Sequence, residues 1–233
     1  MQAVILAAGK GKRLLPLTED LPKGMLPING KPMLQIIIEQ LKAVKITDIT
    51  IIVNYCQEKI IDYFKDGAQF GVKIRYAYQK EMNGTADAVL QAEPCVNSNQ
   101  FLCIACDSLF EKGLLERILK HNTGVITCKA VKDHKRYGIL KTQGSQVLEI
   151  VEKPELPPSN LANFSVYLFP KEIFAACKLV KPSLRGELEI NDAIKTLINQ
   201  ETKFTYEVSS HIMDIGTFEQ LSEAEEVARE LGL

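Results

Sequence analysis

The sequence predicts an α/β fold in which a mixed, mainly parallel sheet is flanked by helices. Short apolar runs alternate with segments of helical period through the first half of the chain, which is the pattern of parallel strands covered on both faces. The 233 residues are 46% hydrophobic, enough to bury a large core. No internal repeat or low-complexity segment interrupts this pattern. We therefore expect one domain over residues 1–233.

The expected strands and helices alternate through the first half. Apolar runs predict buried strands over residues 3–8, 49–53, 72–78 and 101–106. Pro32 suits the first turn of a helix and precedes apolar residues at helical spacing. These residues are Leu34, Ile37, Ile38, Leu41 and Val44. Further helices are expected near residues 58–64 and from about residue 85.

The second half mixes shorter strands with helices. Strands are expected near residues 124–131, 138–140, 147–151 and 164–169, and helices near 171–179, 189–199 and 218–231. Three prolines between residues 154 and 160 indicate an extended loop. Because both flanks of this loop look structured, we expect it to lie inside the domain, within a sheet extension that carries inserted hairpins.

Charge and hydropathy exclude several classes of partner. The chain has 28 basic and 29 acidic residues, and this formal charge of −1 creates no global field for nucleic acid or anionic lipid. The N-terminal apolar run lacks a basic leader, and no apolar stretch approaches membrane length. We expect a cytoplasmic protein that binds neither nucleic acid nor membrane and holds charged ligands through a local cluster.

The six cysteines are scattered, and several lie in apolar runs where a reduced thiol acts as a small hydrophobe. Cys103 and Cys106 form a C-x-x-C pair, but no second cysteine or histidine pair lies at zinc spacing. We expect neither a zinc site nor a redox role.

The strongest chemical signal is the loop after the first strand. Gly9 and Gly11 let backbone N–H groups approach a polyphosphate, and the loop and its continuation are rich in cations. The cationic side chains are Lys10, Lys12, Arg13 and Lys23. The loop lacks the Gly-Lys-Ser/Thr of the Walker motif and the third glycine of the dinucleotide fingerprint. It therefore predicts an anion cradle of another type.

This stretch, Leu-Ala-Ala-Gly-Lys-Gly-Lys-Arg-Leu-Leu-Pro-Leu-Thr followed by Leu-Pro-Lys-Gly-Met-Leu-Pro, resembles the signature of the sugar-1-phosphate nucleotidylyltransferases. Lys12 stands where that family usually has threonine, and Gly24 where it often has proline. The resemblance implies a Rossmann-like fold of the nucleotide-diphospho-sugar transferase type. Its nucleotide-binding half would cover about residues 1–110 and its sugar-phosphate-binding half about 111–233.

The resemblance also assigns roles within the loop. It implies that Ala8, Gly9 and Gly11 bind the nucleotide. Arg13 would grip the pyrophosphate leaving group, and Lys23 would stabilise charge on the α-phosphate. These two side chains are the predicted catalytic residues.

A second motif, Gln79 followed by Asn83-Gly84-Thr85-Ala86-Asp87, is similar to the base-recognition segment of the same family. The glutamine amide can pair with a pyrimidine edge, and the glycine lets the backbone do the same. Gly84 and Thr85 are therefore predicted nucleotide-binding residues, and Gly-Thr-Ala favours UTP over dTTP. Thr85 is also a candidate helix cap.

Two aspartates are the predicted metal ligands. Asp107 follows the strand that ends at Cys106, and a carboxylate at the carboxyl end of a parallel strand points into the ligand crevice. Asp214 lies in Met-Asp-Ile-Gly-Thr, which is similar to the family's W-x-D-x-G-T segment. Oxygen ligands suit Mg²⁺, the expected cofactor. The family usually has glycine where Cys106 stands.

The resemblance places the sugar phosphate in the second half. It implies that Glu152 takes sugar hydroxyls, that Lys153 contacts the phosphate, and that the backbone of Tyr137 and Gly138 closes on the ring. Asn163 matches the asparagine of the family's N-x-G-x-Y segment, in which Ser165 replaces the glycine. The pattern is typical of enzymes for N-acetylglucosamine 1-phosphate.

The resemblance therefore implies a magnesium-dependent enzyme that transfers a nucleotidyl group from UTP or dTTP to a hexose 1-phosphate, with glucose or N-acetylglucosamine as the sugar. A general base is not needed, because a phosphate monoester is largely ionised above a pKa of about 6. Other acceptors, N-acetylmuramate 1-phosphate or phosphocholine, and a non-catalytic sensor of nucleotide sugars stay open. So does assembly into a homo-oligomer.

Overall fold

The structure, a computed structural model, describes residues 1–233. Its strands are β1 (Gln2–Leu6), β2 (Pro27–Ile28), β3 (Lys31–Pro32), β4 (Asp48–Val53), β5 (Lys73–Tyr78), β6 (Gln100–Ala105), β7 (Ser108–Phe110), β8 (Gly124–Ala130), β9 (Gly138–Gln143), β10 (Gln146–Glu152), β11 (Leu161–Pro170), β12 (Phe204–Val208) and β13 (Ile212–Asp214). Its α-helices are α1 (Met33–Ala43), α2 (Gln57–Phe64), α3 (Thr85–Leu90), α4 (Leu114–Ile118), α5 (Ile173–Cys177), α6 (Ile190–Asn199) and α7 (Phe218–Leu231).

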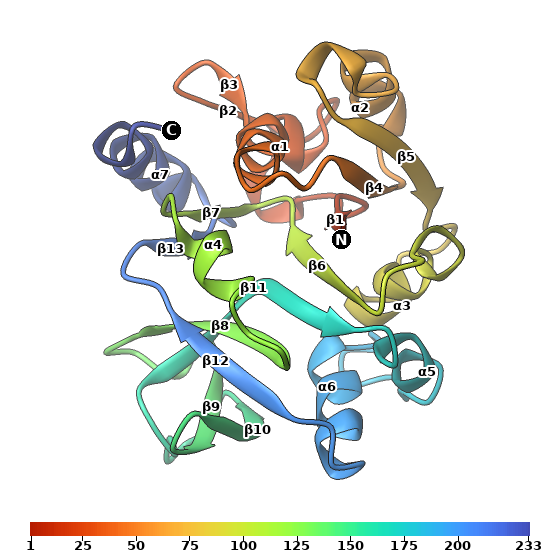
Figure 1. Cartoon of the computed structure of the whole chain (residues 1–233). Coiled ribbons are helices and arrows are strands. Elements are labelled where there is room, and N and C mark those ends of the chain that lie inside the picture. Colours follow the sequence, from red (N-terminus) through yellow and green to blue (C-terminus); the bar gives the residue numbers. More distant parts are fainter.

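Nine strands form one sheet in the order β5-β4-β1-β6-β11-β8-β12-β10-β9 (Figure 1). The four strands of the first half, β5, β4, β1 and β6, pair in parallel. Their apolar residues are buried on both sides, as in Ile49, Ile51 and Ile52 of β4. This arrangement confirms the fold class predicted from alternating apolar runs and helices.

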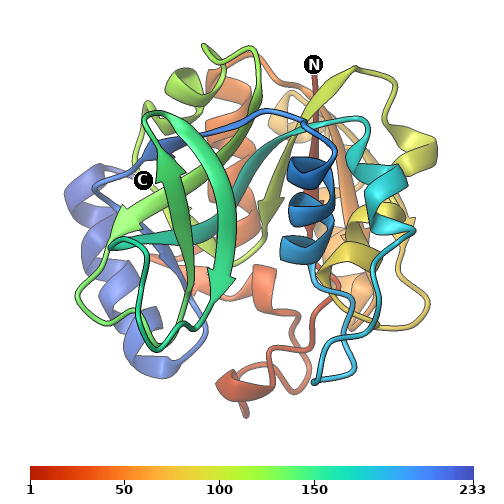
Figure 2. The same ribbon diagram turned by 90° about the horizontal axis from the view of Figure 1, so that it is seen from below.

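The second half joins the same sheet mostly in antiparallel fashion. β11 runs antiparallel to β6 and to β8, and only the β8–β12 pair is parallel. β9 also contacts β11, so β11, β8, β12, β10 and β9 curl into a closed group (Figure 2). Parallel pairing is thus confined to the first half and the β8–β12 pair, because the second half is built from hairpins.

Helices cover both faces of the sheet. Apolar residues of α1, α2 and α4 pack into one core cluster, together with Ile5 and Ile51 of the central strands. Residues of α3, α5 and α6 pack into a second cluster on the other face, against Val4 and Ile52. Consecutive residues of one strand point to opposite faces, which is why Val4 and Ile5 belong to different clusters.

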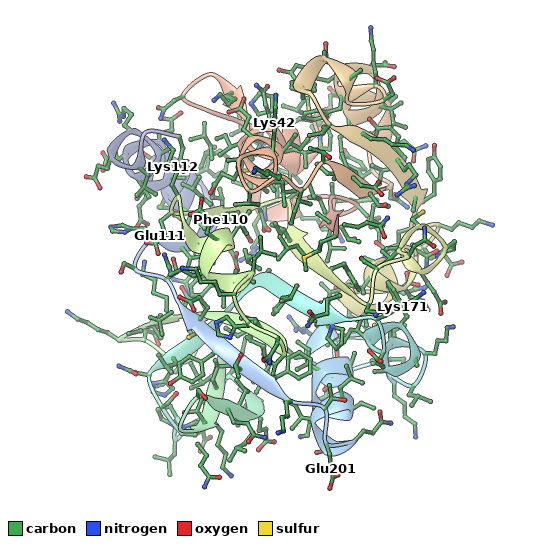
Figure 3. All side chains as sticks on the ribbon, in the orientation of Figure 1. Lys42, Phe110, Glu111, Lys112, Lys171 and Glu201 are labelled. Carbon is green, nitrogen blue, oxygen red and sulfur yellow. The ribbon has the colours of Figure 1, made fainter.

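A small two-stranded sheet, β7 and β13, lies beside the main one and was absent from the sequence prediction. It pairs Ser108 with Asp214, and α7 follows β13 directly. Thr217 caps α7 by accepting from the N–H of Gln220 (3.3 Å). At the other end of α7, Lys112 (labelled in Figure 3) donates to the carbonyl of Gly232 (2.5 Å).

None of the helices combines the length and apolar character that a membrane span requires.

Candidate active site

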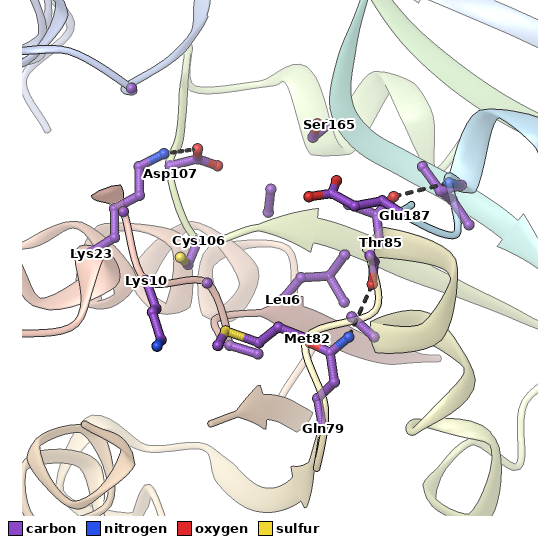
Figure 4. Close-up of a pocket in the computed structure, with 18 of the residues that line it drawn as sticks. Leu6, Lys10, Lys23, Gln79, Met82, Thr85, Cys106, Asp107, Ser165 and Glu187 are labelled. Atoms are coloured by element: carbon purple, nitrogen blue, oxygen red, sulfur yellow. Dashed lines mark hydrogen bonds and ion pairs between the residues drawn. The ribbon is translucent and has the colours of Figure 1, made fainter. Parts of the chain in front are cut away.

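A pocket of about 600 Å³ opens where β1 and β6 end (Figure 4). Its lining begins with Leu6 and Ala8 at the end of β1 and with Ala105, Cys106 and Asp107 at the end of β6. The second half of the chain contributes Ser165 and Tyr167 of β11. The pocket therefore lies at the carboxyl ends of parallel strands, where open α/β sheets bind ligands, and both halves of the chain contribute to it.

The glycine loop forms one wall of the pocket. Gly11 has a φ of +62°, and a Cβ there would lie 3.1 Å from Thr18 Cγ2 and 3.3 Å from Lys23 Cβ. The Thr18 hydroxyl donates to the Gly11 carbonyl (2.9 Å) and holds the turn closed. Nothing lies within 4 Å of the equivalent position at Gly9. The backbone is thus open to a ligand at Gly9 and tightly packed at Gly11.

The cations of the loop are distributed around this wall. Lys10, Lys12, Arg13 and Lys23 all line the pocket. The ammonium of Lys10 lies 5.6 Å from the centre of the Tyr55 ring. Arg13 packs on Gly216, where a Cβ would lie 2.7 Å from a guanidinium nitrogen. Gly216 was not singled out from the sequence, although it follows Asp214 in the matched Asp-x-Gly-Thr segment.

Lys23 forms an ion pair with Asp107 at one side of the pocket (Figure 4). The lysine is the first residue of a 3₁₀ turn that follows Pro22, and its side chain is only 12% exposed. Burial acts to lower the pKa of Lys23, but the adjacent Asp107 carboxylate outweighs it and the pKa is raised. Lys23 is therefore a fixed, desolvated positive charge in the pocket.

Gly24 and Cys106, two departures from the family signature, contact each other. A Cβ at Gly24 would lie 3.2 Å from the Cβ and 3.3 Å from the Sγ of Cys106. Burial raises the pKa of the Cys106 thiol to about 12, so it stays protonated at neutral pH. The thiol thus fills space that a proline ring at position 24 would need, which gives the two departures a common physical cause.

Asp214 reaches the same corner from β13. Its Oδ1 accepts from the Ser108 hydroxyl (3.0 Å), and its charge interacts with both Asp107 and Lys23. Burial, with the Asp107 charge added, raises the pKa of Asp214 to about 7. Asp214 does not itself line the pocket, but the structure brings these two predicted metal ligands close enough for their charges to interact.

The donor set at this corner fits Mg²⁺. Burial and, after it, the Asp107 charge raise the pKa of Asp214, and a divalent cation held by the two carboxylates would offset both. Three or more protein groups do not cluster as metal ligands anywhere in the chain. Two carboxylates suffice, however, for Mg²⁺, which commonly completes its coordination with water and substrate phosphates.

The predicted base-recognition segment lies on the opposite side of the pocket. Gln79, Gly84 and Thr85 all line it. Gly84 has a φ of +117°, and a Cβ there would lie 2.5 Å from the Leu188 carbonyl oxygen, so only glycine fits. Gly84 also occupies the N-cap position of α3. The prediction that Thr85 caps this helix is wrong, because its hydroxyl accepts from the N–H of Ile190 (2.9 Å).

The five predicted sugar-binding residues form a group outside the lining of the main pocket. Gly138 pairs with Glu152 across β9 and β10, and the N–H of Lys153 donates to the Tyr137 carbonyl (3.0 Å). Asn163 joins them from β11 through Asn191. This group was predicted only from the family motifs, since its members come from separate strands.

Asn191 connects this group; it lies in the segment from Gly186 to Asp192, which the sequence marks as part of the sugar side without giving Asn191 a role of its own. The Asn163 amide donates to Asn191 Oδ1 (3.0 Å), and Asn191 Nδ2 lies 3.4 Å from Glu152 Oε2. Asn163 also donates to the hydroxyl of Tyr167 (3.0 Å), which lines the main pocket. A continuous polar chain therefore leads from the pocket to Glu152.

Three further lining residues, Ser165, Tyr167 and Glu187, carry no assigned role. Glu187 lies in the Gly-Glu-Leu-Glu-Ile-Asn segment that starts at Gly186, and its carboxylate points into the pocket in Figure 4. The segment itself was the only sequence signal for Glu187 and Asn191, because their side-chain directions depend on how the segment folds.

A glycine loop with four cations, facing two carboxylates at strand ends, defines an α/β protein built to bind phosphates. The family model described as nucleotidyl transferase matches residues 2–230. The chain belongs to this family, which confirms the resemblance seen in its loop motif.

Several relatives are similar over most of the chain. The bifunctional protein GlmU of Methanocaldococcus jannaschii is 43% identical over 217 residues, which are 93% of this chain and 51% of that protein. The chain thus spans about half the length of that relative. The UTP–glucose-1-phosphate uridylyltransferase AglF of Haloferax volcanii is 38% identical over 238 residues, covering 99% of this chain and 97% of AglF.

Solved structures share the fold. A UDP-glucose pyrophosphorylase complexed with UDP-glucose superposes with a TM-score of 0.87 and 26% sequence identity, over 99% of both chains. The mixed α/β arrangement with flanking helices is therefore that of a nucleotide-sugar enzyme.

Proposed function

We propose that this chain transfers a nucleotidyl group from UTP or dTTP to a hexose 1-phosphate, releasing pyrophosphate. The observation that carries the proposal is the buried Lys23–Asp107 pair beside Asp214, next to a glycine loop with Arg13. Such an arrangement supplies positive charge, backbone donors and oxygen ligands around one pocket. The names of AglF and of the UDP-glucose pyrophosphorylase support uridylyl transfer to glucose 1-phosphate.

The base would lie against Gln79 and Gly84. The Gln79 side chain is 4% exposed yet lines the pocket, and its Oε1 has no partner within the protein. The N–H of Gly84 also lacks a protein partner. One acceptor beside one donor complements the N3–H and a neighbouring carbonyl of uracil or thymine. This complementarity favours UTP and dTTP over CTP.

The sugar phosphate would occupy the region between Tyr167 and Glu152. Glu152 and the unpartnered Oδ1 of Asn163 offer acceptors to sugar hydroxyls, and Lys153 offers a charge to the phosphate. Glucose and N-acetylglucosamine are the proposed sugars.

Catalysis in this site consists of alignment and charge stabilisation. An oxygen of the sugar phosphate attacks the α-phosphorus, and the bond from that phosphorus to the β-phosphate bridging oxygen breaks. Lys23 stabilises charge on the α-phosphate, and Arg13 holds the departing pyrophosphate. Because the attacking oxygen is already ionised near neutral pH, no side chain has to remove a proton.

Asp107 and Asp214 would hold Mg²⁺, which supplies charge neutralisation for the phosphate oxygens. The remaining residues of the site then position the nucleoside triphosphate and the sugar 1-phosphate, two anions that would otherwise repel each other. Lys23, buried against Asp107, contributes its charge without reorganisation of solvent.

The proposal is tested with purified protein, Mg²⁺ and a matrix of nucleoside triphosphates and sugar 1-phosphates, with pyrophosphate release as the readout. Release from UTP or dTTP with glucose or N-acetylglucosamine 1-phosphate is the expected result. Silence across the matrix, followed by release with N-acetylmuramate 1-phosphate or phosphocholine, would change the acceptor. Binding of nucleotide sugars without any release would instead identify a sensor.

The cytoplasm is the proposed location of this reaction. Nucleoside triphosphates are made there, and all six cysteines are free thiols, four of them buried, as suits a reducing compartment.

A further inference from the structure

The orientation of the Gln79 amide is fixed by two acceptors. Its Nε2 donates to the carbonyl of Gly84 (3.0 Å) and to Oδ2 of Asp87 (2.8 Å). A carbonyl and an ionised carboxylate can only accept, so both N–H bonds of the amide must point toward them. A flipped amide would place its oxygen against two acceptor oxygens. The usual ambiguity between amide nitrogen and oxygen is therefore absent here.

The amide oxygen is consequently the atom that Gln79 presents to the pocket. Gln79 Oε1 has no hydrogen-bond partner in the protein, and it is not among the buried polar atoms that lack one, so it stays accessible. Because the residue is 4% exposed and lines the pocket, that access is from the pocket side. Figure 4 shows the nitrogen end of Gln79 directed toward the turn at Gly84 and Thr85.

Asp87 accepts a hydrogen bond from Gln79 but does not itself line the pocket. It lies in α3, and its second oxygen, Oδ1, accepts from Gln91 Nε2 (3.0 Å) one turn further along. Gln91 also donates to the Asp87 carbonyl (3.2 Å). Both carboxylate oxygens are thus engaged, and the carboxylate cannot rotate away from Gln79 without losing a charge-assisted bond.

We infer that Asp87 is a specificity-determining positioning residue, which keeps an acceptor facing the base and so selects pyrimidines with an N3–H over cytosine. The inference rests on the proposed function and names how its base preference is set. Uracil and thymine carry a donor at N3, whereas cytosine carries an acceptor there. Against cytosine the fixed Oε1 would face another acceptor, and a buried pair of acceptors is strongly disfavoured.

Asp87→Asn is the sharpest test, because it keeps the volume while it removes the charge and replaces one acceptor oxygen by a donor NH₂ group. An asparagine can turn its NH₂ toward a flipped Gln79 while its oxygen still accepts from Gln91. The orientation of the Gln79 amide then depends on the Gly84 carbonyl alone. Asp62→Asn is the matched control: the same change on helix α2, at an exposed residue with no side-chain partner and outside the pocket.

The readout is the ratio of kcat/KM for UTP to kcat/KM for CTP, measured with the sugar 1-phosphate that the wild type uses best. Asp87→Asn should lower this ratio by at least about fivefold, and Asp62→Asn should leave it within about twofold of wild type. A loss of folding or of general activity would change both substrates equally and leave the ratio constant. Asp87→Ala, which removes the second acceptor entirely, should lower the ratio as well and serves if the asparagine variant is insoluble.

A ratio for both Asp87 variants within about twofold of wild type, with UTP still turned over, would overturn the inference. If the wild-type protein turned over neither nucleotide, the proposed function would fail separately. The same ratio would then be taken from the dissociation constants of UTP and CTP, and the same fivefold criterion would decide the role of Asp87.

Discussion

Lys23 and Asp107 form an ion pair at one side of the pocket, although 84 residues separate them in the sequence. Lys23 follows Pro22 in a 3₁₀ turn, and Asp107 follows β6. The carboxylate holds the ammonium in place, while Asp214 adds a second negative charge nearby. A triphosphate entering the pocket would therefore meet a lysine that is already oriented and desolvated.

Replacing Lys23 with alanine should lower kcat about 10²- to 10³-fold, as removal of one preorganised charge-stabilising group does in other enzymes. Because Lys23 is buried and paired, the variant should also lose about 1–3 kcal/mol of unfolding free energy. Steady-state kinetics and urea unfolding measure the two effects. Lys73→Ala, on the exposed face of edge strand β5, is the control and should change neither. Wild-type turnover in Lys23→Ala would contradict the role of Lys23.

The raised pKa of Asp214 predicts a pH-dependent stability. The pKa is about 7 in the folded chain and 3.8 in the reference state, so between these values only the folded chain keeps the proton. The free energy of unfolding should therefore fall as pH rises from about 4 to 7 and stay low above it. Asp214→Asn should remove this decline and be more stable than wild type at pH 8 without metal. Thermal unfolding across this pH range measures it, and a variant that tracks the wild type at every pH would refute the assignment.

The same group should make magnesium binding depend on pH. A carboxylate must lose its proton to bind the cation, so Mg²⁺ should raise the melting temperature more at pH 8 than at pH 5.5. Asp107→Asn and Asp214→Asn should each weaken this magnesium-induced shift. An equal shift at both pH values, or an unchanged shift in both variants, would remove these residues from the metal site.

The contact between Gly24 and Cys106 predicts that the two positions are energetically coupled. Gly24→Pro alone should destabilise the chain by about 1–3 kcal/mol, because the ring would overlap the thiol. In a Cys106→Gly background the same substitution should cost less, by a coupling energy of at least about 1 kcal/mol. Urea unfolding of the four proteins in this cycle gives the coupling. If the changes in unfolding free energy of the two single substitutions simply added up in the double variant, positions 24 and 106 would be independent.

Asn191 should matter for the sugar and not for the nucleotide. It links Asn163 to Glu152, so Asn191→Ala should raise the KM for the sugar 1-phosphate about tenfold and leave the KM for UTP unchanged. Asn199→Ala, at the exposed end of the same helix, is the matched control. A parallel rise in both KM values would indicate a general defect instead of a role for Asn191 among the sugar-binding residues.

Much of the fold was predictable because local patterns specify it. The apolar run at β1, the helical spacing after Pro32 and the Thr217 cap of α7 each determine an element through a few neighbouring residues. The glycine loop was equally clear, since backbone freedom and cationic side chains lie within one short stretch. These features need no knowledge of distant parts of the chain.

The remaining parts depend on contacts between distant segments. β7 and β13 are three residues each and lie about 100 residues apart, too short to recognise singly, yet their pairing brings Asp214 beside Asp107. The contact of Gly24 with Cys106 and the Asn191 link likewise join separate segments. A single sequence carries the residues for these contacts but no local signal that joins them.

Nucleotidyl transfer is tested by following the α-phosphate itself. UTP labelled at the α-phosphorus is incubated with the protein, Mg²⁺ and glucose or N-acetylglucosamine 1-phosphate. We expect the label to move into a UDP-sugar while the other two phosphates leave as unlabelled pyrophosphate, and we expect Lys23→Ala to lose this transfer. Label that stays in UTP, or that appears as UMP whether or not the sugar phosphate is present, would contradict it.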